Sequence, residues 1–470
     1  MLAAAHERKF IASLAAEIFK NTTRLINGAY MQEMKTLQPL TRAQHSMWLG
    51  HNYHGSLPFH TAEWLVIEGP LDRELFHQAV ARTLQEAKAL HWRVIEQDGK
   101  FYRKDDVEIQ PPRFTDLSQL NEKALNEWVE QQVLPAFDLT AGHLYDYAFA
   151  HLDDHKYGLF LRAHHAALDG YAYGLLISRF IDYYQSLKNG TGLKNKAFEH
   201  YGKFIEEEQR YIGSEKAAAD LAFWKSSFSG PQAPQKRLKR RLNEPFTQGY
   251  RFEDVIAAGV QQQLNALASE LKLPSAMIVM AVFMGYMAKQ LDDPQQCFGI
   301  PMLSRLGTAA MRIPCLTMNI LPLRLGAHGA ENLKDLVQLL ASRFAEIRPY
   351  QQSYFEQMRF VLDDFEPFEN ILFGPVVNWI PFPLPEFFEG CRLKKTTISA
   401  GPIEDFDMAV SNKMVDGQER LYLAIDGHPE LYTAASLEEY WHDFMKMLQL
   451  WLIQPELALN EFEVGKKLPD

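Results

Sequence analysis

Two adjacent histidines, an aspartate and a glycine stand close together in the segment 164–170, which reads HHAALDG. Histidine titrates near neutral pH, so its imidazole can take a proton from an attacking amine or hydroxyl and return it. An aspartate at this spacing can fix a histidine tautomer or hold the loop by pairing with an arginine. Glycine lets the backbone approach a neighbour closely. These residue types indicate acid–base chemistry centred on His164 or His165, supported by Asp169 and Gly170.

The same residues have other interpretations. The segment 159–165 has the composition of a strand, and successive side chains of a strand point to opposite faces. One histidine is therefore expected to point into a cleft, and the other to pack and hydrogen-bond within the protein. Two histidines and a carboxylate also occur in iron and zinc sites. Adjacent histidines that face opposite ways disfavour a metal site, but the segment alone does not separate local packing from catalysis.

The elements around this segment predict how it is held. Alternating side chains over 144–164 predict a β-hairpin that turns at 153–155. A helix is predicted over 171–187, ending at Asn189-Gly190. Further helices are predicted at 72–90, 198–212, 260–271, 276–291 and 333–347, with a last helix that opens at Ser436 in a capping box. Strands are predicted at 296–301, 320–325, 376–381 and 420–425. This alternation is typical of a layered α/β fold.

The length of the chain predicts more than one lobe. The 470 residues exceed one ordinary core and indicate two lobes of similar α/β content that meet at a cleft. The stretch 230–248 is rich in Pro, Lys and Arg and is the candidate linker. Residues 1–30 have the pattern of an extra amphipathic helix, or of an extension upstream of the true start.

Composition excludes several classes of protein. The net charge of −11 disfavours nucleic acid as a partner. The basic run 236–241 is expected to be a solvated linker, or alternatively a docking patch for an acidic partner. The chain has three cysteines (Cys297, Cys315 and Cys391). Their odd number and wide spacing disfavour a disulfide framework and a zinc site and suit a reducing cytoplasm.

No membrane anchor or signal peptide is expected. The most apolar stretch, 276–288, is shorter than the ~18–20 residues that span a bilayer. It is predicted to be a buried core helix.

The segment HHAALDG resembles the HHxxxDG motif of the condensation domains of nonribosomal peptide synthetases. The wider superfamily includes chloramphenicol-acetyltransferase-like and CoA-dependent acyltransferases with HxxxD. Other segments resemble motifs of the condensation family in the same order, over about residues 36 to 465: LTRAQHSMW at 40–48, ALHWRV at 89–94 (where His91 departs from the family's arginine), PAFDL at 135–139, AFW at 222–224, SRLG at 304–307, NILPL at 319–323, GPVVN at 374–378 and GPIEDF at 401–406.

The resemblance implies an α/β fold of two chloramphenicol-acetyltransferase-like lobes, arranged as a V-shaped pseudodimer with a central tunnel. The expected division is an N-terminal extension at 1–35, an N-terminal lobe at 36–215 and a C-terminal lobe at 216–470. Carrier-protein thioesters are expected to enter the tunnel from one or both faces.

The resemblance also assigns roles. The family's second histidine faces the tunnel, which here is His165, and Asn378 matches an active-site asparagine across it. Asp169 matches a mainly structural aspartate that pairs with an arginine of the second lobe, here Arg305. His164 and Gly170 are expected to support the site, and no metal is expected.

The segments HHAALDGYAYGLL, FIEEEQRYI, PMLSRLGTAA and MNILPLRL are similar to proteins of siderophore assembly. The resemblance therefore implies a free-standing, cytoplasmic condensation enzyme that acts as a monomer. It would transfer an acyl or aryl group, expected to be 2,3-dihydroxybenzoyl, from an aryl or acyl carrier protein to an amine that is free or carrier-bound. It would bind no cofactor of its own, because the phosphopantetheine thioester arrives on the carrier protein.

Three alternatives remain. A CoA-dependent acyltransferase or an epimerisation-type enzyme would have the same fold, and epimerisation uses the same HHxxxDG motif. A non-catalytic, condensation-like docking protein would have no need for the tunnel histidine.

Overall fold

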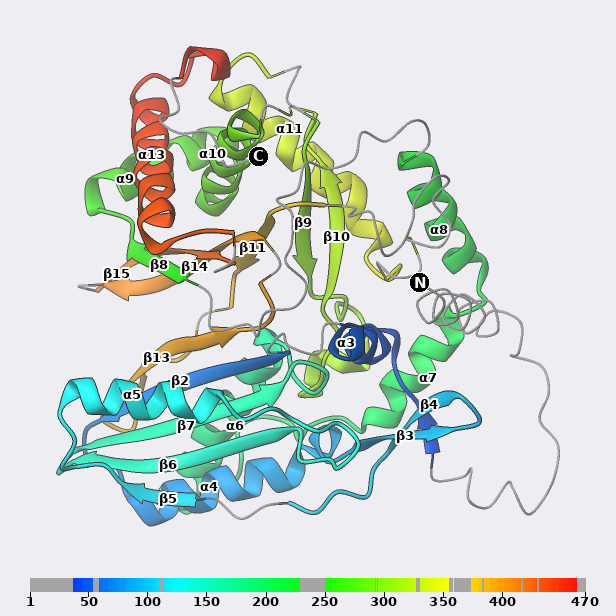
Figure 1. The fold of residues 1–470 in the computed structure, drawn as a ribbon. Coiled ribbons are helices and arrows are strands. Elements are labelled where there is room, and N and C mark those ends of the chain that lie inside the picture. The colour runs from blue at the N-terminus through cyan, green and yellow to red at the C-terminus, as the bar shows by residue number, and fades with distance from the viewer. Residues whose placement is uncertain are drawn as a thin grey trace.

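The computed structural model describes residues 37–462, apart from 54–58, 110–112, 229–249, 292, 294, 327–329, 355–357, 359–372, 383, 404, 416 and 429–430. Two six-stranded sheets, one three-stranded sheet and the helices packed on them make up this part of the chain. Figure 1 shows the first large sheet with its helices in the lower half of the view and the second large sheet in the upper half. The prediction of an α/β fold is confirmed.

The first large sheet comes mainly from the N-terminal half of the chain. Its strand order is β12 (Phe387–Phe388), β13 (Cys391–Ala400), β2 (His60–Glu68), β7 (Lys156–His164), β6 (Tyr145–Asp153) and β5 (Arg113–Asp116). Helices α4 (Arg73–Glu86) and α6 (Gly170–Asn189) cover one apolar face, and α5 (Glu122–Val133) covers the other. A separate three-stranded sheet contains β1 (Leu37–Pro39), β4 (Lys100–Lys104) and β3 (Arg93–Gln97).

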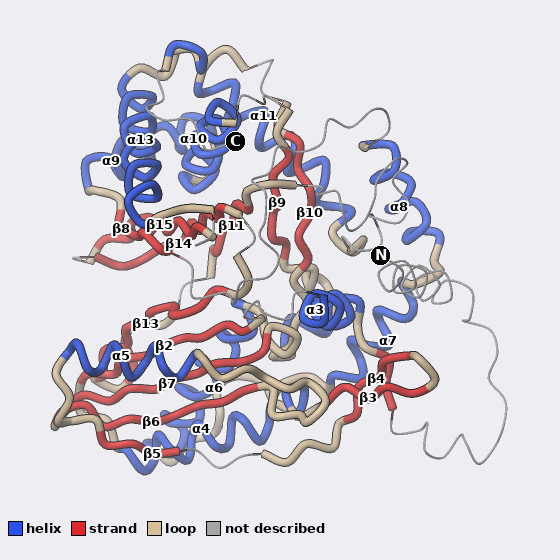
Figure 2. Tube along the Cα trace, in the orientation of Figure 1, coloured by secondary structure: helices blue, strands red, loops and turns tan. Residues whose placement is uncertain are grey.

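The second large sheet comes from the C-terminal half. Its strand order is β10 (Asn319–Arg324), β9 (Cys297–Met302), β11 (Val376–Ile380), β14 (Phe406–Val415), β15 (Gln418–Gly427) and β8 (Tyr250–Val255). Helices α9 (Ala258–Leu271), α10 (Ser275–Gln290), α11 (Leu333–Ile347) and α13 (Ala434–Ile453) pack on one face through a single apolar core. Figure 2 shows these helices on one side of the strands and the first sheet on the other.

The remaining described helices are α3 (Arg42–Tyr53), α7 (Tyr201–Tyr211), α8 (Glu215–Ser227) and the short 3-10 helices η1 (Lys88–Leu90), η2 (Ala309–Arg312), η4 (Arg348–Tyr350) and η5 (Leu459–Glu461).

The two halves exchange segments. Strand β13 follows β11 in the sequence, yet it pairs with β2 of the first sheet, from Arg392 opposite Glu68 to Ala400 opposite Thr61. The segment between β9 and β10 packs its apolar side chains, including Ala310, on α7. A division of the chain at 215 and 216 therefore does not follow the sheets, because β12 and β13 complete the first sheet from the C-terminal side of that boundary.

Most predicted elements are present. The hairpin is β6 and β7, and the helix expected at 171–187 is α6, which ends at Gly190 in the left-handed conformation with φ 63°. The helix expected at 72–90 ends earlier, at Glu86. The last helix begins at Ala434 rather than Ser436, because Thr433 caps it and shares the capping box with Ser436. The predictions for residues 1–30, the linker 230–248 and the basic run 236–241 lie outside the described residues.

Within the described ranges, no single helix is long and apolar enough to cross a membrane, and α9 and α10 meet the criteria only as a pair bent by 101°. Nearly every residue of α10 is buried in the second core. The prediction of a buried core helix there is confirmed.

Candidate active site

The site begins where β7 ends. His164 is the last residue of the strand, and a turn follows in which the Ala167 N–H donates to the His164 carbonyl at 2.8 Å. Asp169 then caps α6, because its Oδ1 accepts the Ala172 N–H at 2.9 Å. A short polar cap after a strand of apolar residues is a common way to begin a helix. Strand, turn and cap together fix the backbone on both sides of His165.

Two backbone carbonyls hold His165, one through its main chain and one through its ring. Its own N–H donates to the Phe59 carbonyl at 2.7 Å, and its Nδ1 lies 2.8 Å from the Leu168 carbonyl. A carbonyl oxygen only accepts, so Nδ1 carries the proton and the lone pair of a neutral ring is on Nε2. The Nε2 edge lies against Gly401, where an added Cβ would be 3.0 Å from Cδ2 and 3.5 Å from Nε2.

The environment keeps His165 uncharged at neutral pH. Its side chain is only 6% exposed, and burial lowers its pKa from 6.5. The negative charge of Asp169 and the hydrogen bond to Leu168 oppose this shift but do not reverse it. A neutral imidazole with its lone pair on Nε2 can accept a proton.

His164 has a partner on each ring nitrogen. Its Nδ1 accepts the Ala166 N–H at 3.0 Å, and its Nε2 lies 3.3 Å from Nδ1 of His51. The rings of Phe59 and Phe137 lie beside it, with ring centroids 6.3 Å away in each case. Burial lowers the pKa of His164 well below 6.5, and the neighbouring histidines lower it further. Although several histidines gather here, no group of three or more His, Cys, Asp or Glu side chains in the described ranges is arranged to hold a metal ion.

Asp169 and Arg305 form the ion pair that the sequence predicts. Arg305 Nη2 donates to Asp169 Oδ2 at 2.6 Å, and both side chains are almost fully buried. The same carboxylate oxygen accepts the N–H of Thr317 at 3.0 Å. The guanidinium also donates to three backbone carbonyls between β9 and β10, those of Ala310, Ile313 and Cys315. The pair therefore ties the start of α6 to a segment from the C-terminal half.

Asn378 lies on the second sheet. It is half-buried on β11 and pairs in register with Ala409 of β14. Its neighbour Val377 is fully buried in the helix-covered core. Because side chains alternate along a strand, Asn378 points away from those helices. Within the described residues no hydrogen bond joins Asn378 to His165, so its role remains a prediction.

Gly170 is the first residue of α6 and is exposed. Apart from its chain neighbours and its own helix, no described residue lies within 4 Å of a Cβ added there. Its supporting role at the site stays a prediction.

Two neighbours of the site escaped prediction. Gly401 was part of a motif without a role, yet it contacts the Nε2 edge of His165 with φ at +109°. The Gly-Pro pair at 401–402 was the available signal. His51 carries no local signal at all, because its contact with His164 joins residues 113 positions apart.

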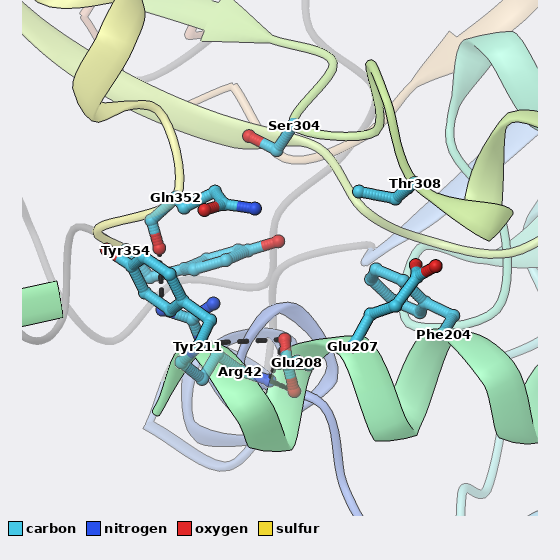
Figure 3. A pocket seen from close by; sticks show the side chains of 9 residues that line it. All are labelled: Arg42, Phe204, Glu207, Glu208, Tyr211, Ser304, Thr308, Gln352 and Tyr354. Carbon is cyan, nitrogen blue, oxygen red and sulfur yellow. Dashed lines mark hydrogen bonds and ion pairs between the residues drawn. The ribbon is translucent and has the colours of Figure 1, made fainter. Parts of the chain in front are cut away.

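A small cavity of the described part lies away from His165, among α3, α7 and the segments around Ser304 and Tyr354. Figure 3 shows Arg42 and Glu208 side by side at its floor, with Gln352 above them. Its volume of about 20 Å³ is room for roughly one water molecule. This cavity is too small for a substrate, and His165 does not line it.

The chain is similar to known proteins over most of its length. The chain is 27% identical over 448 residues to the dimodular nonribosomal peptide synthase of Bacillus subtilis (strain 168), covering 92% of this chain and 18% of that protein. It is 23% identical over 451 residues to enterobactin synthase component F of Escherichia coli (strain K12), covering 91% of this chain and 33% of that protein. The chain thus spans a fifth to a third of the length of these relatives.

A solved structure has the same fold. The starter condensation domain of rhizomide synthetase RzmA, a variant in complex with C8-CoA, superposes with a TM-score of 0.83 at 25% identity, over 93% of this chain and 99% of that one. The family model described as Condensation domain matches residues 34–467. The chain therefore belongs to the condensation-domain family, which comprises enzymes of the acyltransferase type that form amide bonds.

Proposed function

We propose that this protein forms an amide by transferring an acyl or aryl group from a carrier-protein thioester to an amine, with His165 as the group that handles the proton. The observation that supports the proposal most directly is the tautomer of His165. Its Nδ1 bonds the Leu168 carbonyl at 2.8 Å, and this leaves the Nε2 lone pair free to accept a proton. A general base of this kind accelerates a reaction by ~10²–10⁴-fold.

The reaction balances without a covalent enzyme intermediate. The amine nitrogen attacks the thioester carbonyl, the carbon–nitrogen bond forms, and the carbon–sulfur bond breaks. The proton leaves the nitrogen for Nε2 of His165 and then passes to the departing thiolate of the phosphopantetheine arm. Holding the two substrates together contributes about 7–11 kcal/mol at most.

Asn378 is proposed to donate a hydrogen bond to the developing oxyanion or to a substrate group. His164, Asp169 and Arg305 are proposed to support the site. For Asp169 and Arg305 this agrees with their burial and with the ion pair that joins them.

The donor is proposed to be a 2,3-dihydroxybenzoyl group in a siderophore-type synthesis. The support is the resemblance of the segments around His165 and Arg305 to siderophore assembly proteins, together with the likeness to enterobactin synthase component F. The acceptor amine, free or carrier-bound, is left open. A cytoplasmic monomer is part of the proposal, and the three cysteines, which are buried and form no disulfide, agree with a reducing compartment.

A second candidate is transfer from acyl-CoA. It is favoured by one observation, the likeness to a starter condensation domain whose solved structure contains C8-CoA. An epimerisation-type enzyme and a docking protein have the same fold and remain possible outcomes of a test.

The experiment loads an aryl carrier protein with 2,3-dihydroxybenzoate, adds a panel of free and carrier-bound amines, and follows the carrier by intact-mass spectrometry. The proposal predicts loss of the acyl mass and formation of amide only when protein and amine are both present. His165→Ala is expected to lose most of this turnover, and its control is His442→Ala, at an exposed histidine of α13 (59% side-chain exposure). Turnover with octanoyl-CoA but with no loaded carrier would favour the second candidate. Inversion of a carrier-bound aminoacyl group would indicate epimerisation, and carrier binding without turnover would indicate a docking protein.

A further inference from the structure

We propose that His51, a residue outside the HHxxxDG motif, is a positioning residue that fixes the tautomer of His164 and through it the turn that carries His165. The inference rests on the proposed function only where it concerns the rate of amide formation. The hydrogen-bond arrangement itself is independent of the reaction.

The two ring nitrogens of His164 fix where its proton lies. Its Nδ1 accepts the backbone N–H of Ala166 at 3.0 Å, and an N–H donor fixes Nδ1 as the unprotonated nitrogen. A neutral His164 must then carry its proton on Nε2. That nitrogen lies 3.3 Å from Nδ1 of His51, so His164 donates and His51 accepts. The two rings meet edge to face, with centroids 5.1 Å apart.

One turn of the backbone joins His164 to His165. The Ala166 N–H bond to the His164 ring and the Ala167 N–H bond to the His164 carbonyl close the same turn, at 3.0 and 2.8 Å. The turn places the Leu168 carbonyl 2.8 Å from Nδ1 of His165. His51 therefore fixes the proton of His164, and the turn that His164 closes places the Leu168 carbonyl that fixes the proton of His165.

The Nε2–H of His164 needs an acceptor because the residue is buried. His164 is only 2% exposed, so an Nε2–H without an acceptor would be a buried unpaired donor. Leaving such a group unsatisfied is unfavourable, and the ring would relieve it by rotating or by moving its proton to Nδ1. Either change removes the acceptor of the Ala166 N–H and loosens the turn.

His51 is well suited to accept. It lies in the last turn of α3 beside the ring of Phe59, with centroids 6.2 Å apart. Burial lowers its pKa from 6.5, and the charge of Asp138 opposes this shift without reversing it. His51 is thus neutral at neutral pH. Within the described residues its ring bonds His164 and no hydrogen bond joins it to His165, so its action is through His164.

The test uses two substitutions that separate the hydrogen bond from the packing. His51→Asn keeps an acceptor, because its Oδ1 is bonded to Cγ as Nδ1 is in histidine. His51→Phe keeps a ring of similar size and has no acceptor. His442→Phe, at the exposed histidine of α13, is the matched control.

The first readout is nitrogen NMR of protein labelled with ¹⁵N-histidine, in the wild type. The inference predicts that His164 is the tautomer protonated at Nε2, and that His51→Phe, but not His51→Asn, disturbs the signals of His164 and His165. A wild-type His164 protonated at Nδ1 would overturn the inference, whether or not either variant folds and whether or not the protein forms amides.

The second readout is the kinetics of amide formation with the substrates that the wild type accepts. His51→Phe is expected to lower kcat by about tenfold or more, since small misplacements of a reacting group have effects of this size, with KM little changed. His51→Asn and His442→Phe are expected to retain most of the wild-type kcat. An unchanged kcat in folded His51→Phe, or an equal loss in His51→Asn, would show that the acceptor does not matter.

Discussion

The ring of His165 packs against Gly401, which has no side chain. A methyl group at position 401 would crowd the Nε2 edge of the imidazole. The φ of Gly401, +109°, is a conformation that other residues rarely adopt. Strand alternation indicated that one of the two histidines faces a cleft, and the resemblance to condensation domains assigned this place to His165. The Gly-Pro pair at 401–402 marked Gly401 as part of a motif, but not its contact with His165, because the two segments are far apart in the chain.

A substitution at Gly401 tests this packing. Gly401→Ala is expected to lower the rate of amide formation by about tenfold or more, because the added Cβ would lie 3.0 Å from the His165 ring and push it from its place. The unfolding free energy is expected to fall by about 1–3 kcal/mol from backbone strain. The measurement compares steady-state kinetics and urea unfolding with those of Gly192→Ala, where a Cβ meets nothing within 4 Å. Wild-type kinetics in Gly401→Ala would show that the ring has more room than the structure gives it.

The buried ion pair is the second feature at this scale. Arg305→Met leaves the carboxylate of Asp169 buried without its cation, so the unfolding free energy is expected to fall by about 3–5 kcal/mol. Arg312→Met, which removes an exposed ion pair with Glu199, is expected to cost no more than about 1 kcal/mol. Chemical denaturation measures both variants. Equal losses in the two would contradict a structural role for the buried pair.

At the scale of elements, apolar periodicity located most helices and strands to within a few residues. It succeeded for the hairpin β6–β7 and for α6 because alternation, turn residues and a terminal glycine all agreed there. It placed the start of α13 too late, because the cap at Thr433 outweighs periodicity at a terminus, and it extended α4 over the separate 3-10 helix η1. Caps are formed by individual hydrogen bonds, which a pattern of apolar residues does not encode.

The junction of α3 and α7 gives a prediction at this scale. Arg42 donates to the Gln352 carbonyl at 2.6 Å, and its Nε lies 3.5 Å from the carboxylate of Glu208. Arg42→Met is expected to lower the unfolding free energy at neutral pH by a few kcal/mol, ~3, because Glu208 is left buried without its cation. Arg73→Met, in an exposed pair on α4, is the control.

The pH dependence of that loss has a definite sign. Burial raises the pKa of Glu208, and Arg42 opposes the shift. A raised pKa in the folded state means that folding is favoured as pH falls, and removal of Arg42 raises that pKa further. The destabilisation in Arg42→Met should therefore shrink as the pH is lowered toward the pKa of Glu208 in the variant. A loss that stays constant or grows on acidification, measured by urea unfolding across pH, would contradict this account.

At the scale of the whole molecule, the sequence predicted an α/β protein of two lobes but not how they are interlocked. Strand β13 lies beyond β11 in the chain and completes the first sheet, and Arg305 reaches Asp169 from between β9 and β10. Such long-range pairings leave no periodic signal in one sequence. The resemblance to condensation domains supplied the Asp169–Arg305 pair, whereas the exchange of β13 became visible only in the structure.

The central claim is that Nε2 of His165 accepts the proton during amide formation, and one measurement tests it most directly. The single-turnover rate constant for amide formation from a loaded carrier is compared between the wild type, His165→Ala and the control His442→Ala, after thermal unfolding has shown that all three are folded. The account predicts a rate ~10²–10⁴-fold lower in His165→Ala and an unchanged rate in the control. A folded His165→Ala with the wild-type rate would contradict it.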